Sequence, residues 1–150
     1  MVAQRLAEVT WRGTLGDGAG LVTAISSGAF RELPVTWPSR TSSANERTGP
    51  EELLAAAHAT SFVMALAAEL ERAAPLPGEP WQLDVDAIVT FARTEAGWRV
   101  MASRLAVRGV VPGLDDTQFR ALATAAKNEC ALSQVLSGNV AISIEADLAG

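Results

Sequence analysis

The longest apolar stretch of the chain, residues 48–70, predicts one long buried helix. Alanine, leucine and methionine dominate this stretch, and only a few polar side chains interrupt its apolar surface. Thr48 and Glu51 have the spacing of a capping box, and Pro50 suits a first helical turn, which needs no backbone N–H from it. We therefore expect the helix to begin near residue 49.

Strands are expected on both sides of that helix, because apolar and polar residues alternate there. The predicted strands are residues 5–12, 21–26, 30–37, 81–92, 98–111 and 139–148. Glycine-rich residues 16–20 are expected to form the turn between the first and second strands, and residues 94–97 the turn between the fourth and fifth. Pro34 and Pro38 bar the third strand from the middle of a sheet. Polar residues 39–49 are expected to be irregular.

A second helix is predicted over residues 114–130. Asp115 and Gln118 have capping-box spacing, and an apolar stripe along the segment ends at Cys130, which we expect to face inward from the helix. Between the first helix and the strands after it, proline-rich residues 74–80 predict a helix end and a connection.

The fold class that follows is α+β. At 49% hydrophobic, the chain is large enough to bury a real core, and no repeat or linker divides it, so we expect a single domain over residues 1–150. The long helix is apolar nearly all round, and one sheet covers only one side of a helix. A second layer from another copy of the chain is therefore expected, which predicts a homodimer.

Charge and cysteine usage exclude several classes of protein. The chain has 12 Lys+Arg against 17 Asp+Glu and no basic block, so nucleic acid is not an expected partner. The N-terminus lacks the pattern of a signal peptide, and no apolar run is expected to reach bilayer length, so we predict a cytoplasmic protein with no membrane partner. With one cysteine, Cys130, and one histidine, neither an intrachain disulfide nor a metal site is expected, and no cofactor is predicted.

Four motifs together resemble the OsmC/Ohr family of osmotically inducible and organic hydroperoxide resistance proteins, and the OsmC branch most closely. They are TWRG at 10–13, GPEELLAAAHATSF at 49–62, VPGLD at 111–115 and AAKNECALSQVL at 125–136. The resemblance implies a thiol peroxidase that reduces organic hydroperoxides with two cysteines and is recycled by a dithiol reductant. It also implies antiparallel sheets around a long central helix and an intertwined homodimer with two sites at the subunit boundary.

The resemblance assigns roles to four residues. Arg40 matches the site arginine of the OsmC branch, and Glu51 matches the carboxylate that orients it. Cys130 matches the resolving cysteine, although the proline that follows it in the family is Ala131 here. The position of the peroxidatic cysteine is Ser61.

Ser61 determines which chemistry the sequence predicts. The attacking group must be anionic and must hold the transferred oxygen as a sulfenic acid, which a second thiol then attacks. A serine hydroxyl is a weak nucleophile without an adjacent base and forms no such intermediate. We therefore predict a hydroperoxide-defence scaffold without a two-cysteine cycle. Ser61 is either an engineered substitution or a natural departure from peroxidase activity.

The same residues also have structural explanations. Ser61 can bond a carbonyl one turn earlier in its helix, and Cys130 can be a small buried residue. His58 is expected to be a packed histidine, and Arg40 with Glu51 can be a structural ion pair.

Three other functions remain open. One is a binding protein for a hydrophobic or peroxidised small molecule, with Arg40 at the base of its pocket and Trp37 at an apolar entrance. Another is a redox protein that uses Cys130 alone. A third is a serine hydrolase built on Ser61 and His58, but the chain has no G-x-S-x-G elbow and no third group to orient the histidine.

Overall fold

The structure, a computed structural model, describes residues 1–42, 47–73 and 81–149. It contains two units, Met1–Leu53 and Leu54–Gly150. The segment predicted to connect the first helix to the later strands, residues 74–80, lies outside the described residues. The single domain expected from composition stays a prediction.

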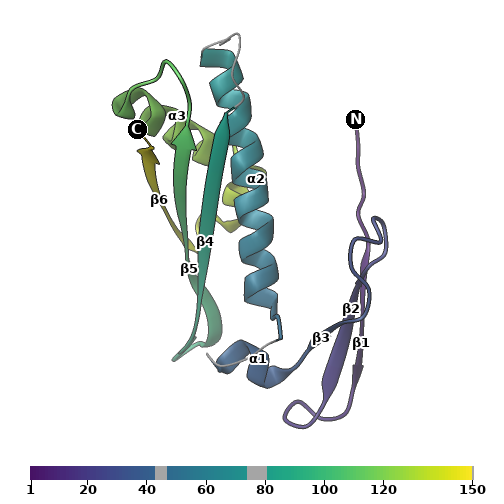
Figure 1. Cartoon of the computed structure of the whole chain (residues 1–150). Helices are drawn as coiled ribbons and strands as arrows, with labels where there is room; N and C mark the ends of the chain where they lie inside the picture. The colour runs from purple at the N-terminus through teal and green to yellow at the C-terminus, as the bar shows by residue number, and fades with distance from the viewer. Residues whose placement is uncertain (43–46, 74–80, 150) are drawn as a thin grey trace. The chain divides into compact units, whose positions relative to one another are not determined.

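The first unit is built on a three-stranded antiparallel sheet in the order β1-β2-β3 (Figure 1). Its strands are β1 (Ala7–Arg12), β2 (Ala19–Ala24) and β3 (Leu33–Val35). All three lie within predicted strands or overlap them, but β3 has only three residues. Pro34 lies in β3 at the edge of the sheet, as its missing N–H requires.

The first unit also contains a short helix, α1 (Trp37–Thr41), where the sequence predicted the end of a strand and an irregular segment. The Thr36 hydroxyl accepts a hydrogen bond from the Ser39 N–H at 3.3 Å, and the Ser39 hydroxyl accepts one from the Thr36 N–H at 3.1 Å. Pro38 lies in the first turn. This capping box was missed because serine takes the place that Glu or Gln usually holds.

The long helix is α2 (Pro50–Ala73), as predicted. The carbonyl of Gly49 accepts a hydrogen bond from the Leu53 N–H at 3.1 Å, so Gly49 holds the cap position. The predicted capping box of Thr48 and Glu51 is therefore out of register by one residue.

One stripe of α2 is buried within the single chain. Its residues repeat every fourth position and are His58, Phe62, Leu66 and Leu70. Met64, on the other side, is 66% exposed. By length and composition alone, the helix is also long and apolar enough to cross a membrane. This corrects the expectation that no apolar run approaches bilayer length, although core helices of soluble proteins meet the same criterion.

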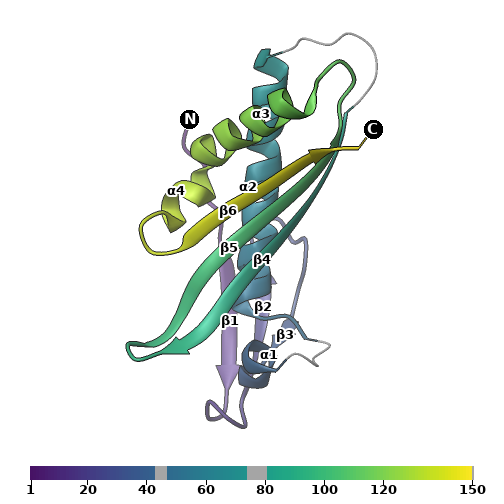
Figure 2. The ribbon, with the colours of Figure 1, turned by 90° about the vertical axis from the view of Figure 1, so that its left-hand side faces the viewer.

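The second unit contains a mixed sheet in the order β4-β5-β6 (Figure 2). The strands β4 (Gln82–Thr94) and β5 (Gly97–Val110) form the predicted antiparallel hairpin. The last strand, β6 (Ala141–Leu148), pairs with β5 in parallel. The resemblance implied antiparallel pairing throughout. β6 departs from it because the chain crosses back through a helical connection before it re-enters the sheet.

That connection consists of two helices, α3 (Asp116–Glu129) and α4 (Ala131–Leu136). The predicted capping box of α3 is confirmed, since the Gln118 N–H donates to the Asp115 carboxylate at 2.8 Å and the Asp115 N–H donates to the Gln118 amide oxygen at 3.0 Å. α4 was not predicted as a separate helix.

The core of the second unit lies between one face of the sheet and the helices α2 and α3 (Figures 1 and 2). Phe62, Leu66 and Leu70 meet side chains from β5 and α3 there. Phe119 is fully buried and packs so closely on Gly109 that an added Cβ would lie 2.5 Å from its ring. This core holds the inner residues of α2 in a dry environment.

Candidate functional site

Ser61 of α2 and Cys130 are neighbours within the second unit. The Cys130 thiol donates a hydrogen bond to the Ser61 hydroxyl over an S–O distance of 3.2 Å. Cys130 is 1% exposed. It does not lie within a helix as predicted, because its backbone is extended and joins α3 to α4. The inward orientation was expected, whereas the break in the helix was not.

Hydrogen bonds adjust the acidity of the Cys130 thiol. Burial alone raises the pKa of a thiol by disfavouring the charged form. Polar groups near the sulfur favour the thiolate and outweigh burial, so the pKa of Cys130 lies below its ordinary value. These groups are the Ser61 hydroxyl, the backbone and hydroxyl of Ser133, and the backbone of Leu132. Cys130 is therefore more easily ionised than an ordinary buried cysteine.

His58 is fully buried in the same unit. Its Nδ1 is 2.7 Å from the Ser103 hydroxyl, and its Nε2 is 2.8 Å from the Ser133 hydroxyl. Burial lowers the pKa of His58, so the ring is held neutral. The interpretation of His58 as a packed histidine is confirmed, and both ring nitrogens are engaged away from Ser61.

Sequence reasoning missed Ser103 and Ser133. Ser103 occupies an inward position of β5, where the alternation of the strand otherwise places apolar residues. Ser133 follows Cys130 by one helical turn. A polar residue at an inward strand position is a signal that it has a buried partner, because a lone buried hydroxyl is unfavourable.

Arg40 and Glu51 form an ion pair within the first unit. Arg40 Nη2 lies 2.5 Å from Glu51 Oε1, and Arg40 Nε lies 3.2 Å from both carboxylate oxygens. The side chains are 29% and 14% exposed, respectively. The guanidinium also lies over the Trp37 ring, 5.6 Å from its centroid. The carboxylate thus fixes the orientation of the guanidinium.

An apolar pocket of about 240 Å³ opens beside this ion pair, also within the first unit. Its lining residues are Trp11, Leu15, Val35, Thr36, Trp37, Arg40 and Pro50. Indole rings and one guanidinium are a combination that suits an alkyl chain with a polar or anionic end. Trp37 and Arg40 were the residues expected to line such an entrance.

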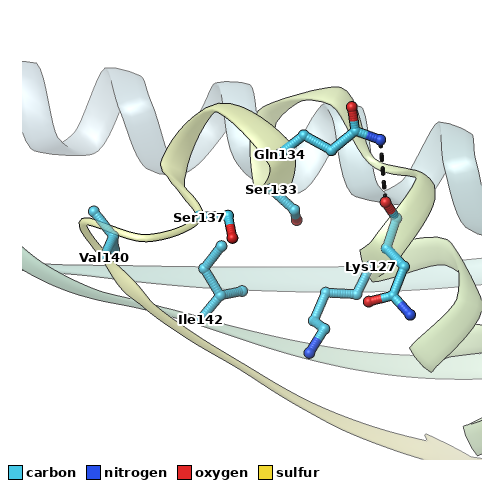
Figure 3. Close-up of a pocket in the computed structure, with 7 residues that line it drawn as sticks. Lys127, Ser133, Gln134, Ser137, Val140 and Ile142 are labelled. Atoms are coloured by element: carbon cyan, nitrogen blue, oxygen red, sulfur yellow. Dashed lines mark hydrogen bonds between the residues drawn. The ribbon is translucent and has the colours of Figure 1, made fainter.

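A second pocket, of about 270 Å³, lies beside α4 in the second unit (Figure 3). Its lining residues are Lys127, Asn128, Ser133, Gln134, Ser137, Val140 and Ile142. The Gln134 amide donates to the Asn128 carbonyl at its rim, 3.1 Å away. Ser133 thus belongs both to the wall of this pocket and to the buried hydrogen bonds around His58.

The four predicted site residues form two pairs. Ser61 and Cys130 meet in the second unit, and Arg40 and Glu51 meet in the first. Among the described residues, no group of three or more His, Cys, Asp or Glu side chains is arranged to hold a metal ion.

Comparison with known proteins places this geometry in context. The model of the family described as OsmC-like protein matches residues 43–145. Peroxiredoxin OsmC of Escherichia coli is 31% identical over 95% of this chain and 96% of its own. The organic hydroperoxide resistance protein of Xanthomonas axonopodis is 27% identical over 81% and 82% of the two chains. In the crystal structure of the organic hydroperoxide resistance protein OhrB of Bacillus subtilis, the fold agrees with a TM-score of 0.71 over 95% and 98% of the chains, at 24% identity.

Proposed function

Because the chain belongs to the family of OsmC-like proteins, we propose that it serves defence against organic hydroperoxides, with Ser61 and Cys130 as its reacting pair and Arg40 and Glu51 as its binding pair. Two relatives are named for peroxiredoxin activity and for resistance to organic hydroperoxides. In the chain as written, the site lacks a two-cysteine cycle, because position 61 carries a hydroxyl.

The observation that carries this proposal is the 3.2 Å distance between the Ser61 oxygen and the Cys130 sulfur. A thiolate at position 61 would attack the O–O bond of a hydroperoxide, take one oxygen as a sulfenic acid and release the alcohol. Cys130 would then attack that sulfur, form a disulfide and release water. A dithiol reductant would return both sulfurs to thiols. Ser61 stops this sequence at its first step.

Arg40 and Glu51 are assigned the binding part of this function. Glu51 orients the guanidinium, and the apolar pocket beside Arg40 accommodates the alkyl group of a hydroperoxide. The substrate class is therefore a hydroperoxide with an apolar chain.

A cytoplasmic homodimer is the proposed state of the protein. Large apolar side chains are exposed in the single chain, and those in the range of 40–66% include Val9, Trp11, Leu21, Ile25 and Met64. A second copy would remove such surface from water, which favours association.

The test is the substitution Ser61→Cys. With tert-butyl hydroperoxide and dithiothreitol, the original chain and a Ser61→Ala control should consume no peroxide, whereas Ser61→Cys should turn it over repeatedly. Ser61→Cys combined with Cys130→Ser should lose the resolving step. A folded Ser61→Cys protein that leaves the peroxide untouched would contradict the proposal.

A second candidate is binding without turnover, favoured by the apolar pocket beside Arg40. An alkyl carboxylate should then raise the melting temperature of the original chain, because a ligand stabilises the state to which it binds. Trp37→Ala should abolish that shift, whereas the exposed-site control Glu71→Ala should retain it. A shift that survives Trp37→Ala would place the ligand elsewhere.

A redox role of Cys130 alone is the third candidate, and its support is the lowered pKa of the thiol. Burial of Cys130 opposes it, since a reagent must reach the sulfur. Rapid labelling by iodoacetamide in the folded protein would favour this role. Labelling that requires denaturant would contradict it.

A further inference from the structure

We propose that the pocket beside α4 is a ligand site of its own, which binds a short carboxylate that carries a hydroxyl group. The Lys127 ammonium and the Ser133 hydroxyl bind the carboxylate. Ser137 binds the hydroxyl group, and the aliphatic side chains of Val140 and Ile142 contact the carbon chain. The inference does not depend on the proposed function, because the lining of this pocket lies within the second unit and includes neither pair assigned to hydroperoxide defence.

Lys127 supplies the positive charge of this pocket. It is the single lysine of the chain and is half-buried on α3. Within the part of the chain that the structure describes, no carboxylate forms an ion pair with it. A half-buried ammonium without a partner is stabilised by an anion. One positive charge matches a carboxylate better than a phosphate group, whose charge at neutral pH is about −1.5 to −2.

Buried hydrogen bonds behind Ser133 allow its hydroxyl to donate to an anion. His58 Nε2 is 2.8 Å from this hydroxyl, and His58 Nδ1 is 2.7 Å from the Ser103 hydroxyl. Neutral His58 has one N–H, and each serine has one proton to give. When Ser133 donates to a carboxylate, it accepts from Nε2–H, and Nδ1 accepts from Ser103. All of these groups are then satisfied, so a bound anion selects one tautomer of the ring.

The rest of the pocket suits a hydroxyl group and a short chain. Ser137 follows Ser133 by one helical turn, and its N–H donates to the Ser133 carbonyl at 2.9 Å. Among the described residues, none hydrogen-bonds the Ser137 hydroxyl. Figure 3 shows the two hydroxyls, Ile142 and Lys127 around one space. Its volume of about 270 Å³ is below the range of drug-sized ligand pockets, roughly 300–1,000 Å³, so the ligand is small.

The experiment titrates β-hydroxybutyrate into the untagged, isotope-labelled full chain and follows the ring nitrogens of His58 by NMR. His58 is the single histidine of the chain, so its resonances need no further assignment. We expect saturable binding, with Nε2 protonated and Nδ1 unprotonated in the bound protein. Shifts that do not saturate, or a bound ring with its proton on Nδ1, would overturn the proposal.

Three variants locate the ligand. Lys127→Met should weaken binding at least about tenfold, because a hydrogen bond between charged groups is lost. Arg93→Gln removes one positive charge from an exposed position of β4 and should leave the dissociation constant unchanged. Trp37→Ala alters the apolar pocket of the first unit and should also leave it unchanged, which distinguishes the two pockets. Equal dissociation constants for Lys127→Met and Arg93→Gln would contradict the assignment of Lys127.

A comparison of β-hydroxybutyrate with butyrate tests the ligand class. Butyrate lacks the hydroxyl group and should bind about fivefold more weakly, because one neutral hydrogen bond is lost. Ser137→Ala should abolish this preference and leave the binding of butyrate unchanged. A preference that survives Ser137→Ala would contradict the role of Ser137. Inorganic phosphate that binds as tightly as β-hydroxybutyrate would contradict the carboxylate class.

Discussion

The two polar clusters of the molecule differ in charge and in burial. In the first unit, Arg40 and Glu51 carry full charges, and both side chains keep some contact with solvent. In the second unit, His58 and its serine partners are neutral and almost completely buried. Burying a charge is costly even when it is paired, whereas neutral groups that satisfy one another are tolerated in a dry core.

The difference teaches how each cluster can act on a reacting group. A guanidinium that remains partly exposed can bind an incoming ligand, because it is not deeply buried and its charge stays accessible. The buried cluster has no charge to offer, and it can influence its surroundings only through its hydrogen bonds. Removing packing or partners from the buried cluster should therefore cost more stability than breaking the ion pair.

The largest expected effect comes from the packing that keeps the buried cluster dry. Phe62→Ala should lower the free energy of unfolding by about 3–5 kcal/mol, because a fully buried ring is removed and a cavity is left. Chemical denaturation measures this loss, with exposed Glu71→Ala on the same helix as the matched control. A loss below about 1 kcal/mol would show that the core is not packed as described.

A smaller loss is expected when one buried partner is removed. Ser103→Ala leaves the Nδ1 atom of His58 without its hydrogen bond, which should cost about 1–3 kcal/mol. Ser143→Ala, on an outward position of β6, is the control and should change the free energy of unfolding by at most about 0.5 kcal/mol. Equal losses in the two variants would contradict the buried hydrogen bond.

The pH dependence of stability sharpens the same contrast. Burial lowers the pKa of His58 in the folded state, so the unfolded chain binds the extra proton below its usual pKa of about 6.5. Stability contributed by the neutral ring is complete above that pH and is lost as the pH falls, by at most about 1.4 kcal/mol per unit. Denaturation of the wild type and His58→Gln across this window should show the extra slope only in the wild type. Parallel curves would mean that His58 is not held neutral.

The smallest effect is expected at the ion pair. A double-mutant cycle of Arg40→Gln and Glu51→Gln should give a coupling energy below about 1 kcal/mol, since partly exposed pairs are screened by water. Added salt should reduce it further. A coupling of several kcal/mol would place the pair in a much drier environment and would remove the contrast with the buried cluster.

Much of the fold was predictable because its signals are local. The alternation along β4 and β6 and the capping box of Asp115 and Gln118 each specify an element without reference to the rest of the chain. The parallel pairing of β6 was not predictable in this way, since strand direction depends on the whole connection through α3 and α4. The break at Cys130 was also missed, because no glycine or proline marks it.

The candidate site, like the fold, was predictable only in part. The pairing of Ser61 with Cys130 followed from motifs far apart in the sequence, and their proximity is seen only in the structure. The partners of His58 were missed because two single serines have no period or spacing to reveal them. Sequence patterns identify elements and matched motifs, whereas buried hydrogen bonds between elements require the fold.

The central claim is that position 61 faces Cys130 closely enough to complete a thiol cycle. Its most direct test is the intact mass and thiol count of the Ser61→Cys protein after one equivalent of an organic hydroperoxide. We predict the loss of two hydrogens and of both free thiols, as an intrachain disulfide between the introduced sulfur and Cys130 requires. Gain of oxygen at position 61 with Cys130 still free would contradict the account.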